Sequence, residues 1–373
     1  MTRSALAAVA TTLLWTGSAF ASGLIRVAIV ENARAAELSG TAIEVSELGC
    51  SGCAPWRAWR AGLVRAVVSG RGVEIDGRRA AGFRLTSERP IRMNGREYPA
   101  SLEVVKNGDG MAIINQLPLE DYVVGVLRAE TGERWPPETL RAQAIVARTY
   151  AAYHRALNAG KPYHIVASTA HQVYAGRVAA ASPIWDAVRE TAGQVLFWEG
   201  ELFPAFYHSA SGGYTEDPRT VFAARNMPAL HAIRDEFSSG SPHFTWSLDL
   251  RLADLTEILR RNGADVGAIT AIEITERTPS LRASVLTIHG ARGSARVRGN
   301  DFRRMVGYET IKSTLFAVAL DGAIARFAGR GYGHGVGMSQ WGAKGMAEQG
   351  YRAERILEYY YPGTTLGSLN TGK

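Results

Sequence analysis

The sequence predicts an α+β protein, because strand-like and helix-like segments occupy different stretches of the chain. From about residue 24 to 114, short alternating apolar runs are separated by turn pairs typical of β-hairpins. These pairs are Asp76-Gly77, Asn94-Gly95 and Asn107-Gly108. From about 118 to 158 apolar residues recur with helical spacing, and later segments mix both patterns. We therefore expect an N-terminal β-rich region, a helical core, and a mixed α/β C-terminal part with an inserted subdomain.

The first 21 residues have the pattern of a cleavable export signal. Arg3 supplies a positive start, residues 5–14 are apolar, and Ala19-Phe20-Ala21 places small residues at the −3 and −1 positions of a cleavage site. The alternative is an N-terminal helix of the fold. We expect export to the periplasm or cell wall. No membrane span is expected after cleavage, because no later apolar run approaches the roughly 20 residues that a spanning helix needs.

The β-rich region contains the two cysteines of the chain, Cys50 and Cys53. Their spacing occurs in thioredoxin-type redox pairs, which place the first cysteine at a helix start after a strand, whereas the flanks here are loop-like. In an oxidising compartment such a pair also forms a short-range structural disulfide that pins a hairpin, and this is our expectation. A zinc site is not expected, since no histidine lies between Cys53 and His154.

Two helices joined by a short turn are the most definite local structure. Pro118 suits a first helical turn, and the apolar residues Leu119, Val123 and Leu127 follow at intervals of four, with Glu130 at the end of this face. Residues 131–134 break the helix. A longer helix is predicted from Trp135 to about Asn158, with one small apolar stripe made of Leu140, Ala144, Ala147 and Ala151.

The remaining elements are shorter. A helix is predicted over 251–261, strands over 269–275, 283–289 and 295–298, and helices over 299–306 and 352–360. The resulting division of the chain is a signal peptide (1–21), the β-rich region (22–101), a core (102–230), an inserted α/β subdomain (231–328) and a C-terminal Gly-rich motif with a helix that completes the core (329–373).

Composition and net charge limit both the class of protein and the kinds of molecule that it is expected to bind. Hydrophobic residues make up 46% and charged residues 21% of the chain, which excludes collagen-like, coiled-coil and wholly disordered proteins. The net charge is +7, and removal of Arg3 with the signal leaves (42 − 1) − 35 = +6. A basic exported protein suits anionic polymers such as cell-wall glycan. We do not expect nucleic acid as a partner, because no dense Lys/Arg block with interleaved aromatic residues is present.

Several common catalytic signatures are missing from the sequence. It contains no P-loop, nucleophile elbow, His-Glu-x-x-His or dinucleotide-binding glycine motif, so nucleotide binding, α/β-hydrolase and zincin chemistry lose their main supports. Glu130 is the best acid/base candidate, because a carboxyl at the end of an apolar helix face beside Trp135 would be partly desolvated and its pKa raised. The alternative is an exposed glutamate paired with Arg128 or Arg134.

Three later segments are rich in small, hydroxyl and aromatic side chains: 168–174, 207–213 and 331–341. In the last of these, His334 stands among alternating glycines that would let a ligand approach the backbone, and Gln340-Trp341 offers hydrogen bonds and a face for a sugar ring. Such segments suit recognition of a polar polymer. The alternative is tight-turn chemistry with a buried, hydrogen-bonded histidine.

Taken together, several segments in a fixed order resemble the stage II sporulation protein D / amidase enhancer LytB family, from about Leu102 to Thr365. They include Glu130 followed by Trp135-Pro136, then Arg148-Thr149-Tyr150-Ala151, Gln172-Val173-Tyr174, Ser211-Gly212-Gly213 and Gly333-His334-Gly335-Val336-Gly337. The resemblance implies a peptidoglycan lytic transglycosylase with Glu130 as its catalytic acid and base. It implies glycan strands as substrate, which the sporulation members cleave after removal of stem peptides.

In the mechanism that the resemblance implies, one carboxyl acts twice and no second catalytic carboxylate is needed, unlike in hydrolysing glycosidases. We expect a glycan groove lined by Thr169, Gln172, Tyr174, Tyr207, Ser211, His334 and Gln340. The rival interpretation is a non-catalytic glycan-binding protein that enhances a cell-wall amidase, and a redox protein using Cys50 and Cys53 is a more distant third.

Two positions depart from the family pattern. Some sporulation members hold zinc through His and Cys residues after the long helix, but here that segment has His164 and His171 and no cysteine, so we expect neither a metal nor another cofactor. Thr131 stands where many members have an apolar residue, which implies a more polar pocket beside Glu130.

Overall fold

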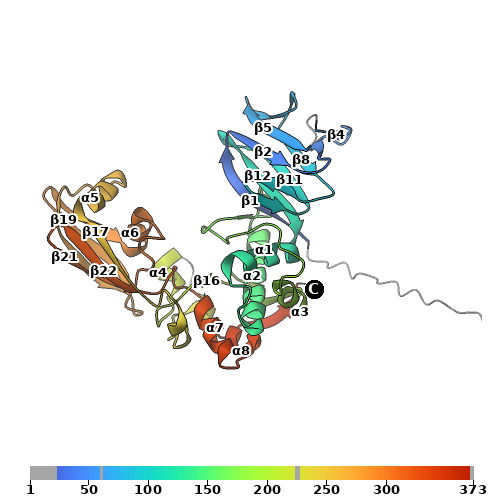
Figure 1. The fold of residues 1–373 in the computed structure, drawn as a ribbon. Coiled ribbons are helices and arrows are strands. Elements are labelled where there is room, and N and C mark those ends of the chain that lie inside the picture. The colour runs from blue at the N-terminus through green and yellow to red at the C-terminus, as the bar shows by residue number, and fades with distance from the viewer. Residues whose placement is uncertain (1–22, 59–61, 223–226, 370–373) are drawn as a thin grey trace, which may run out of the picture.

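The computed structural model describes residues 23–58, 62–222 and 227–369. The export signal expected at 1–21 lies outside these residues. The α+β prediction is confirmed, because the chain combines eight described α-helices with several antiparallel sheets. Figure 1 shows the N-terminal sheets stacked on α1 and α2, while the strands from β17 to β22 form a separate lobe on the other side.

The N-terminal region consists of two sheets. The seven-stranded sheet has the order β13-β1-β12-β11-β8-β3-β4, and the six-stranded sheet has the order β10-β9-β2-β5-β6-β7. The strands of the first are β1 (Leu24–Ala33), β3 (Glu44–Glu47), β4 (Trp56–Arg57), β8 (Gly82–Thr86), β11 (Ser101–Asn107), β12 (Gly110–Pro118) and β13 (Ile165–Val166). Those of the second are β2 (Ala35–Ser39), β5 (Leu63–Ser69), β6 (Gly72–Ile75), β7 (Arg78–Ala80), β9 (Ile91–Met93) and β10 (Arg96–Tyr98).

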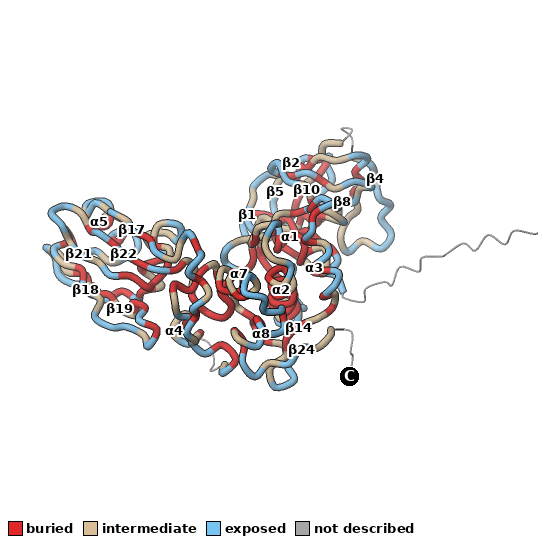
Figure 2. The backbone as a smooth tube through the Cα atoms, turned by 60° about the horizontal axis from the view of Figure 1, so that its bottom comes forward, coloured by how far each residue is buried: buried red, intermediate tan, exposed pale blue. Residues whose placement is uncertain are grey.

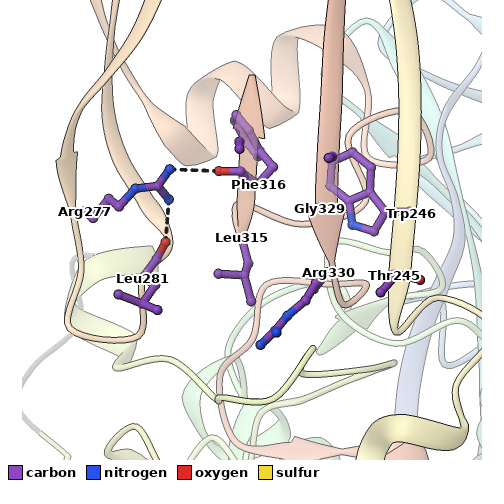
Figure 3. A pocket seen from close by; sticks show the side chains of 10 residues that line it. Thr245, Trp246, Arg277, Leu281, Leu315, Phe316, Gly329 and Arg330 are labelled. Atoms are coloured by element: carbon purple, nitrogen blue, oxygen red, sulfur yellow. Dashed lines mark hydrogen bonds between the residues drawn. The ribbon is translucent and has the colours of Figure 1, made fainter. Parts of the chain in front are cut away.

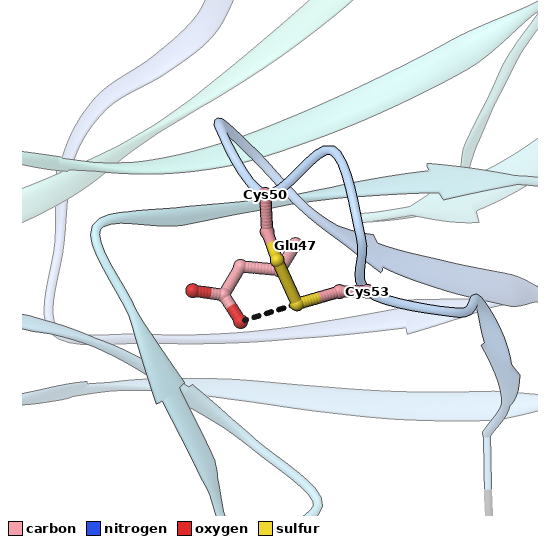
Figure 4. Close-up of a disulfide and its surroundings, with 3 residues drawn as sticks. All are labelled: Glu47, Cys50 and Cys53. Carbon is pink, nitrogen blue, oxygen red and sulfur yellow. Dashed lines mark hydrogen bonds between the residues drawn. A yellow bond between two sulfur atoms is a disulfide. The ribbon is translucent and has the colours of Figure 1, made fainter.

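The hairpin turns lie where the turn pairs predicted them. Asp76-Gly77 joins β6 to β7 and Asn94-Gly95 joins β9 to β10, and all four residues have positive φ, as the tightest hairpin turns require. The two cysteines form a disulfide in the turn between β3 and β4, beside Glu47 (Figure 4). No helix starts at this turn, so the strand–cysteine–helix arrangement of a thioredoxin-type pair is not present there.

Helix α1 (Leu119–Glu130) follows β12 without a loop, and Pro118 ends the strand at the N-cap position of the helix rather than in its first turn. Helix α2 (Pro137–Leu157) is close to the predicted length. The predicted apolar stripes of both helices join the strands in one core, which extends from Ile25 to Val188 and spans the division expected at residue 101. The opposite face of α2 enters a second core, so this helix is buried nearly all round (Figure 2).

The second core is built from segments that lie far apart in the sequence. The C-terminal elements return to α2, with β23 pairing parallel to β16 and β24 pairing antiparallel to β14. The elements are α3 (Ile184–Glu190), β14 (Gln194–Trp198), β15 (Glu201–Leu202), β16 (Tyr207–His208), α4 (Pro218–Phe222), β23 (Met338–Ser339), α7 (Gln340–Glu348), α8 (Ala353–Tyr360) and β24 (Thr365–Ser368), with single 3₁₀ turns at Pro228–Leu230 and Phe237–Gly240.

The lobe between these two halves has a core of its own, from Trp246 to Phe327. Two three-stranded antiparallel sheets, β17-β22-β21 and β18-β19-β20, are covered by two short helices. The elements are β17 (Thr245–Arg251), α5 (Leu252–Arg261), β18 (Ile269–Arg277), β19 (Ala283–Gly290), β20 (Gly293–Arg298), α6 (Gly299–Val306), β21 (Phe316–Asp321) and β22 (Ile324–Arg330). In the described residues no helix is long and apolar enough to cross a membrane.

Candidate active site around Glu130

Glu130 is the last residue of α1, and its position is fixed by the way the helix ends. Thr131 adopts an extended conformation, and both its amide and its hydroxyl donate to the carbonyl of Leu127, at 2.9 and 2.8 Å. Arg128 in the last turn pairs with Glu133 at 3.3 Å. Among the described residues no cation lies within ion-pair distance of Glu130, so the structure does not form the Arg128 or Arg134 pair that was the alternative.

The Glu130 carboxylate instead accepts hydrogen bonds from neutral groups on three distant segments. The backbone amide of Val173 donates to Oε1 at 2.9 Å, and Nε2 of Gln340 donates to Oε2 at 3.4 Å. The hydroxyl of Tyr207 also donates to the carboxylate. Burial raises the pKa of Glu130, and the hydrogen bonds from Val173, Gln340 and Tyr207 offset this only in part, so its pKa stays above the ordinary value.

The direction of the Tyr207 hydrogen bond follows from its neighbours. The carbonyl of Ala147 can only accept, so the amide nitrogen of Gln172 faces it at 3.4 Å, and the same nitrogen donates to the Tyr207 hydroxyl at 3.1 Å. The Tyr122 hydroxyl donates to the other end of the Gln172 amide at 3.1 Å. Because Tyr207 already accepts from Gln172, its own proton is directed to Glu130.

Backbone pairing brings Tyr207 and Gln340 together across more than a hundred residues. Tyr207 in β16 lies opposite Met338 in β23, and α7 begins at Gln340. Ser339 caps this helix, because its hydroxyl accepts from the amide of Gly342 at 3.1 Å. The Gly-rich motif therefore places the amide of Gln340 beside the end of α1.

The segment that carries Val173 lies along α1. The amide of Ala175 donates to the carbonyl of Gly125 at 3.1 Å. Gly125 permits this approach, since a Cβ there would lie 2.3 Å from the Tyr174 ring. The amide of Val173 is thus aimed at Glu130 by a close helix–loop contact. A backbone donor has no side-chain signature, which is why the sequence did not identify it.

Two half-buried indoles lie at the same end of α1. The rings of Trp135 and Trp341 meet edge to face, with centroids 5.3 Å apart, and Gly132 packs against Trp135. Trp341 directly follows Gln340 in α7. Lys344 places its ammonium group 5.1 Å from the Trp341 ring centroid. The two indoles offer apolar faces near the carboxyl, and the Lys344 ammonium is paired with Glu348 along α7.

The structure brings together four of the eight predicted site residues, Glu130, Gln172, Tyr207 and Gln340. Gln172 is fully buried and acts on Tyr207 rather than on a ligand. Thr169 is exposed in the turn that precedes this segment.

Tyr174 is not a groove residue, because it is 1% exposed, packs against Tyr122 and donates its hydroxyl to Asn115 at 2.9 Å. Its aromatic ring and hydroxyl serve the core.

Ser211 and His334 also have structural positions. Ser211 is fully buried, and its hydroxyl donates to Asp235 at 2.6 Å. One ring nitrogen of His334 accepts from the amide of Val336 at 3.0 Å, and the other donates to the backbone carbonyl of Tyr207. Burial, followed by the nearby Arg303 and Arg282 guanidinium groups, lowers the pKa of His334 to about 3, so this ring is neutral and holds β16 in place. The buried-turn alternative describes both residues.

The histidines considered for zinc do not converge. His164 accepts from the backbone amide of Arg26 at 3.1 Å, and the His171 ring lies 5.0 Å from that of His154. Within the described part of the chain, no group of three or more His, Cys, Asp or Glu residues is placed to hold a metal ion.

Comparison with known proteins gives two family matches and several relatives. A family described as stage II sporulation protein matches residues 107–198, which include Glu130, Gln172 and Val173. A second family, described only as a domain of unknown function, matches 221–337 and thus the separate lobe.

Among the relatives, an uncharacterized protein of Brachyspira hyodysenteriae is 32% identical over 74% of each chain. The stage II sporulation protein D of Bacillus amyloliquefaciens is 30% identical over 74% of this chain and 81% of the relative. The amidase enhancer of Bacillus subtilis is 31% identical over 65% of this chain and 40% of its own length.

Proposed function

Because this chain belongs to the stage II sporulation protein D family, whose members have cell-wall roles, we propose that it is an exported peptidoglycan lytic transglycosylase with Glu130 as its acid and base. The substrate is the glycan strand of the wall. Export rests on the signal-like first 21 residues, and the basic charge of the chain suits an anionic polymer.

The reaction needs one carboxyl in two states. Protonated Glu130 donates its proton to the oxygen between MurNAc and GlcNAc, and the bond from this oxygen to C1 of MurNAc breaks. The resulting carboxylate then takes the proton of the C6 hydroxyl, whose oxygen bonds to C1 and closes a 1,6-anhydro ring. Water takes no part, so a second carboxylate is not required.

The observation that supports this proposal is the set of partners around Glu130. A carboxyl whose pKa is raised by burial holds a proton to higher pH, as an acid catalyst near neutrality must. Its described hydrogen-bond donors are a backbone amide, a side-chain amide and a phenol. These neutral donors stabilise the Glu130 carboxylate after its proton has been transferred. Unlike a cationic partner, they do not keep Glu130 ionised before the reaction.

The test is mass spectrometry of the products formed by residues 22–373 from glycan strands without stem peptides. We expect anhydro-MurNAc ends from the wild type and none from Glu130→Gln. Glu133→Gln is the matched control, because this nearby carboxylate pairs with Arg128 and is expected to leave cleavage intact. Reducing ends from the wild type would mean hydrolysis by water and would contradict the proposed reaction.

The similarity to a protein named amidase enhancer favours one second candidate, a glycan-binding protein without catalysis that stimulates an amidase. This candidate predicts that wild type and Glu130→Gln sediment equally with glycan, cleave nothing, and accelerate amidase release of stem peptides to the same extent. The two proposed functions therefore differ in whether replacing Glu130 changes the measured activity.

A further inference from the structure

The separate lobe contains an open pocket of about 520 Å³ where its two sheets meet, a volume typical of ligand sites. Its apolar lining includes Trp246, Leu281, Leu315 and Phe316, and Arg277 and Arg330 lie at its edge (Figure 3). No acidic residue lines it. The pocket is formed by β17, β21, β22 and the turn after β18, so it shares no residue with the cluster around Glu130.

One wall of the pocket is an unusual leucine. Leu281 has φ of +65°, a left-handed conformation that large side chains rarely adopt, and its side chain is 57% exposed. Its backbone is held by the turn, because its amide donates to Thr278 at 2.9 Å and its carbonyl accepts from Arg277 at 2.7 Å. The fold thus keeps a bulky apolar side chain at a strained, solvent-facing position where asparagine or glycine would fit better.

The two arginines of the pocket have no carboxylate partner among the described residues. Arg277 gives its two terminal nitrogens to the carbonyls of Leu281 and Phe316. Arg330 is exposed, and its guanidinium group lies 5.6 Å from the Phe244 ring centroid. By contrast, Arg326 on the same face of β22 pairs with Asp321 at 2.7 Å. At the pocket end of β22, Arg330 therefore has no carboxylate partner among the described residues, whereas Arg326 farther along the strand has one.

The floor of the pocket contains a buried indole. Trp246 is 8% exposed, and its indole N–H has no hydrogen-bond partner in the described structure. The ring lies against Gly329, where a Cβ would be 2.2 Å from the indole. Figure 3 shows the indole nitrogen on the side of the ring that faces Thr245 and Arg330. The nitrogen itself has almost no accessible surface, so this unpaired donor lies beneath the pocket wall and is not available to a molecule bound in the pocket.

We propose that this pocket binds a short peptide that ends in a free carboxylate and carries small aliphatic side chains. The carboxylate pairs with Arg330, and the side chains lie on Leu281 and Leu315. A saccharide suits the pocket less well, because Thr245 is its single hydroxyl-bearing residue and the face of Trp246 is covered by Gly329. The inference rests on the proposed function only for the origin of the peptide, which matches the stem peptides of a bacterial wall.

The test is fluorescence anisotropy with an N-terminally labelled tri-alanine peptide and the full chain, compared with the same peptide amidated at its C-terminus. We expect the free acid to bind at least tenfold more tightly than the amide. Arg330→Met removes this difference, whereas the matched control Arg326→Met retains it. Leu281→Asn, which suits the left-handed backbone, weakens both peptides at least threefold while leaving the thermal unfolding midpoint unchanged or raised.

Equal affinity for acid and amide, or the same loss in Arg330→Met and Arg326→Met, would overturn the proposal. So would wild-type protein that binds neither peptide at millimolar concentration, or tri-alanine that is displaced by glycan without stem peptides. Peptide binding can be measured without glycan cleavage. The same protein preparations are therefore also assayed for the release of anhydro-MurNAc ends from glycan. A chain that cleaves glycan without binding the peptide refutes only this inference, and one that binds the peptide without cleaving refutes only the proposed enzyme.

Discussion

Replacing Tyr207 by phenylalanine removes one of the three hydrogen bonds to the Glu130 carboxylate and keeps the aromatic ring. Burial raises the pKa of Glu130, and the Tyr207 hydroxyl is among the groups that lower it in part. A hydrogen bond to a charged group contributes roughly 1.5–3 kcal/mol. Because Tyr207 lowers the pKa of Glu130 less than Val173 and Gln340 do, we expect its loss to favour the protonated carboxyl at the lower end of this range, by about tenfold, since 1.36 kcal/mol corresponds to a factor of ten.

The sign of the effect on activity follows from the first step of the proposed reaction, which needs protonated Glu130. In the wild type, kcat/KM falls as the pH rises through the pKa of Glu130. Tyr207→Phe raises this pKa further, so the alkaline limb of the profile moves to higher pH. The free energy of unfolding of the variant also depends on pH. It is lower than that of the wild type by the smallest amount at acidic pH, where Glu130 is protonated, and the difference grows as the pH rises.

The assay is the rate of anhydro-MurNAc release across pH, with thermal unfolding recorded in the same buffers. Tyr174→Phe is the matched control, because it also removes a buried tyrosine hydroxyl, but one that donates to Asn115 in the core. This control is expected to lose stability and to keep the wild-type alkaline limb. An unchanged limb in folded Tyr207→Phe would refute the hydrogen-bond arrangement around Glu130.

Three further predictions concern other parts of the molecule. Gln172→Glu replaces the donor to Tyr207 by an acceptor, so the Tyr207 proton turns away from Glu130; we expect the same shift of the alkaline limb, and an unchanged pH profile would contradict it. Arg148→Met leaves the carboxylate partner of a fully buried arginine unpaired, and we expect urea unfolding to show a loss of about 3–5 kcal/mol, whereas a loss below about 1 kcal/mol would contradict the burial argument. The double replacement of Cys50 and Cys53 by serine is expected to lower the unfolding temperature and to leave glycan cleavage unchanged, since the disulfide lies in the turn between β3 and β4; loss of cleavage in folded protein would show a redox role.

Much of the fold could be predicted from local patterns. The turn pairs located the hairpins, and the four-residue spacing of Leu119, Val123 and Leu127 identified the buried face of α1. Helix α6 also has the predicted limits. The β17, β21 and β22 strands were not predicted. β21 and β22 form a local hairpin, whereas β17 joins their sheet by pairing with a segment about 80 residues later, as Trp246 does with Gly329.

The site was predictable only in part. Glu130 carried a local signal, a carboxyl ending an apolar face. Small polar and aromatic segments identified where the chain would converge on it, but not which side chains would face inward. Tyr174 and Gln172 are separated by two positions, yet one serves the core and the other orients Tyr207. This difference depends on the contact at Gly125, which composition and spacing do not encode.

The parallel pairing of β16 with β23 has a consequence for the order in which the protein can become active. Tyr207 and Gln340 reach Glu130 only after the whole 245–330 lobe has been made and the C-terminal elements have returned to α2. A nascent or truncated chain that ends before β23 has the carboxyl but lacks the Gln340 donor and the strand that holds Tyr207. The donors around Glu130 that the proposed activity uses are thus complete only when synthesis is nearly finished.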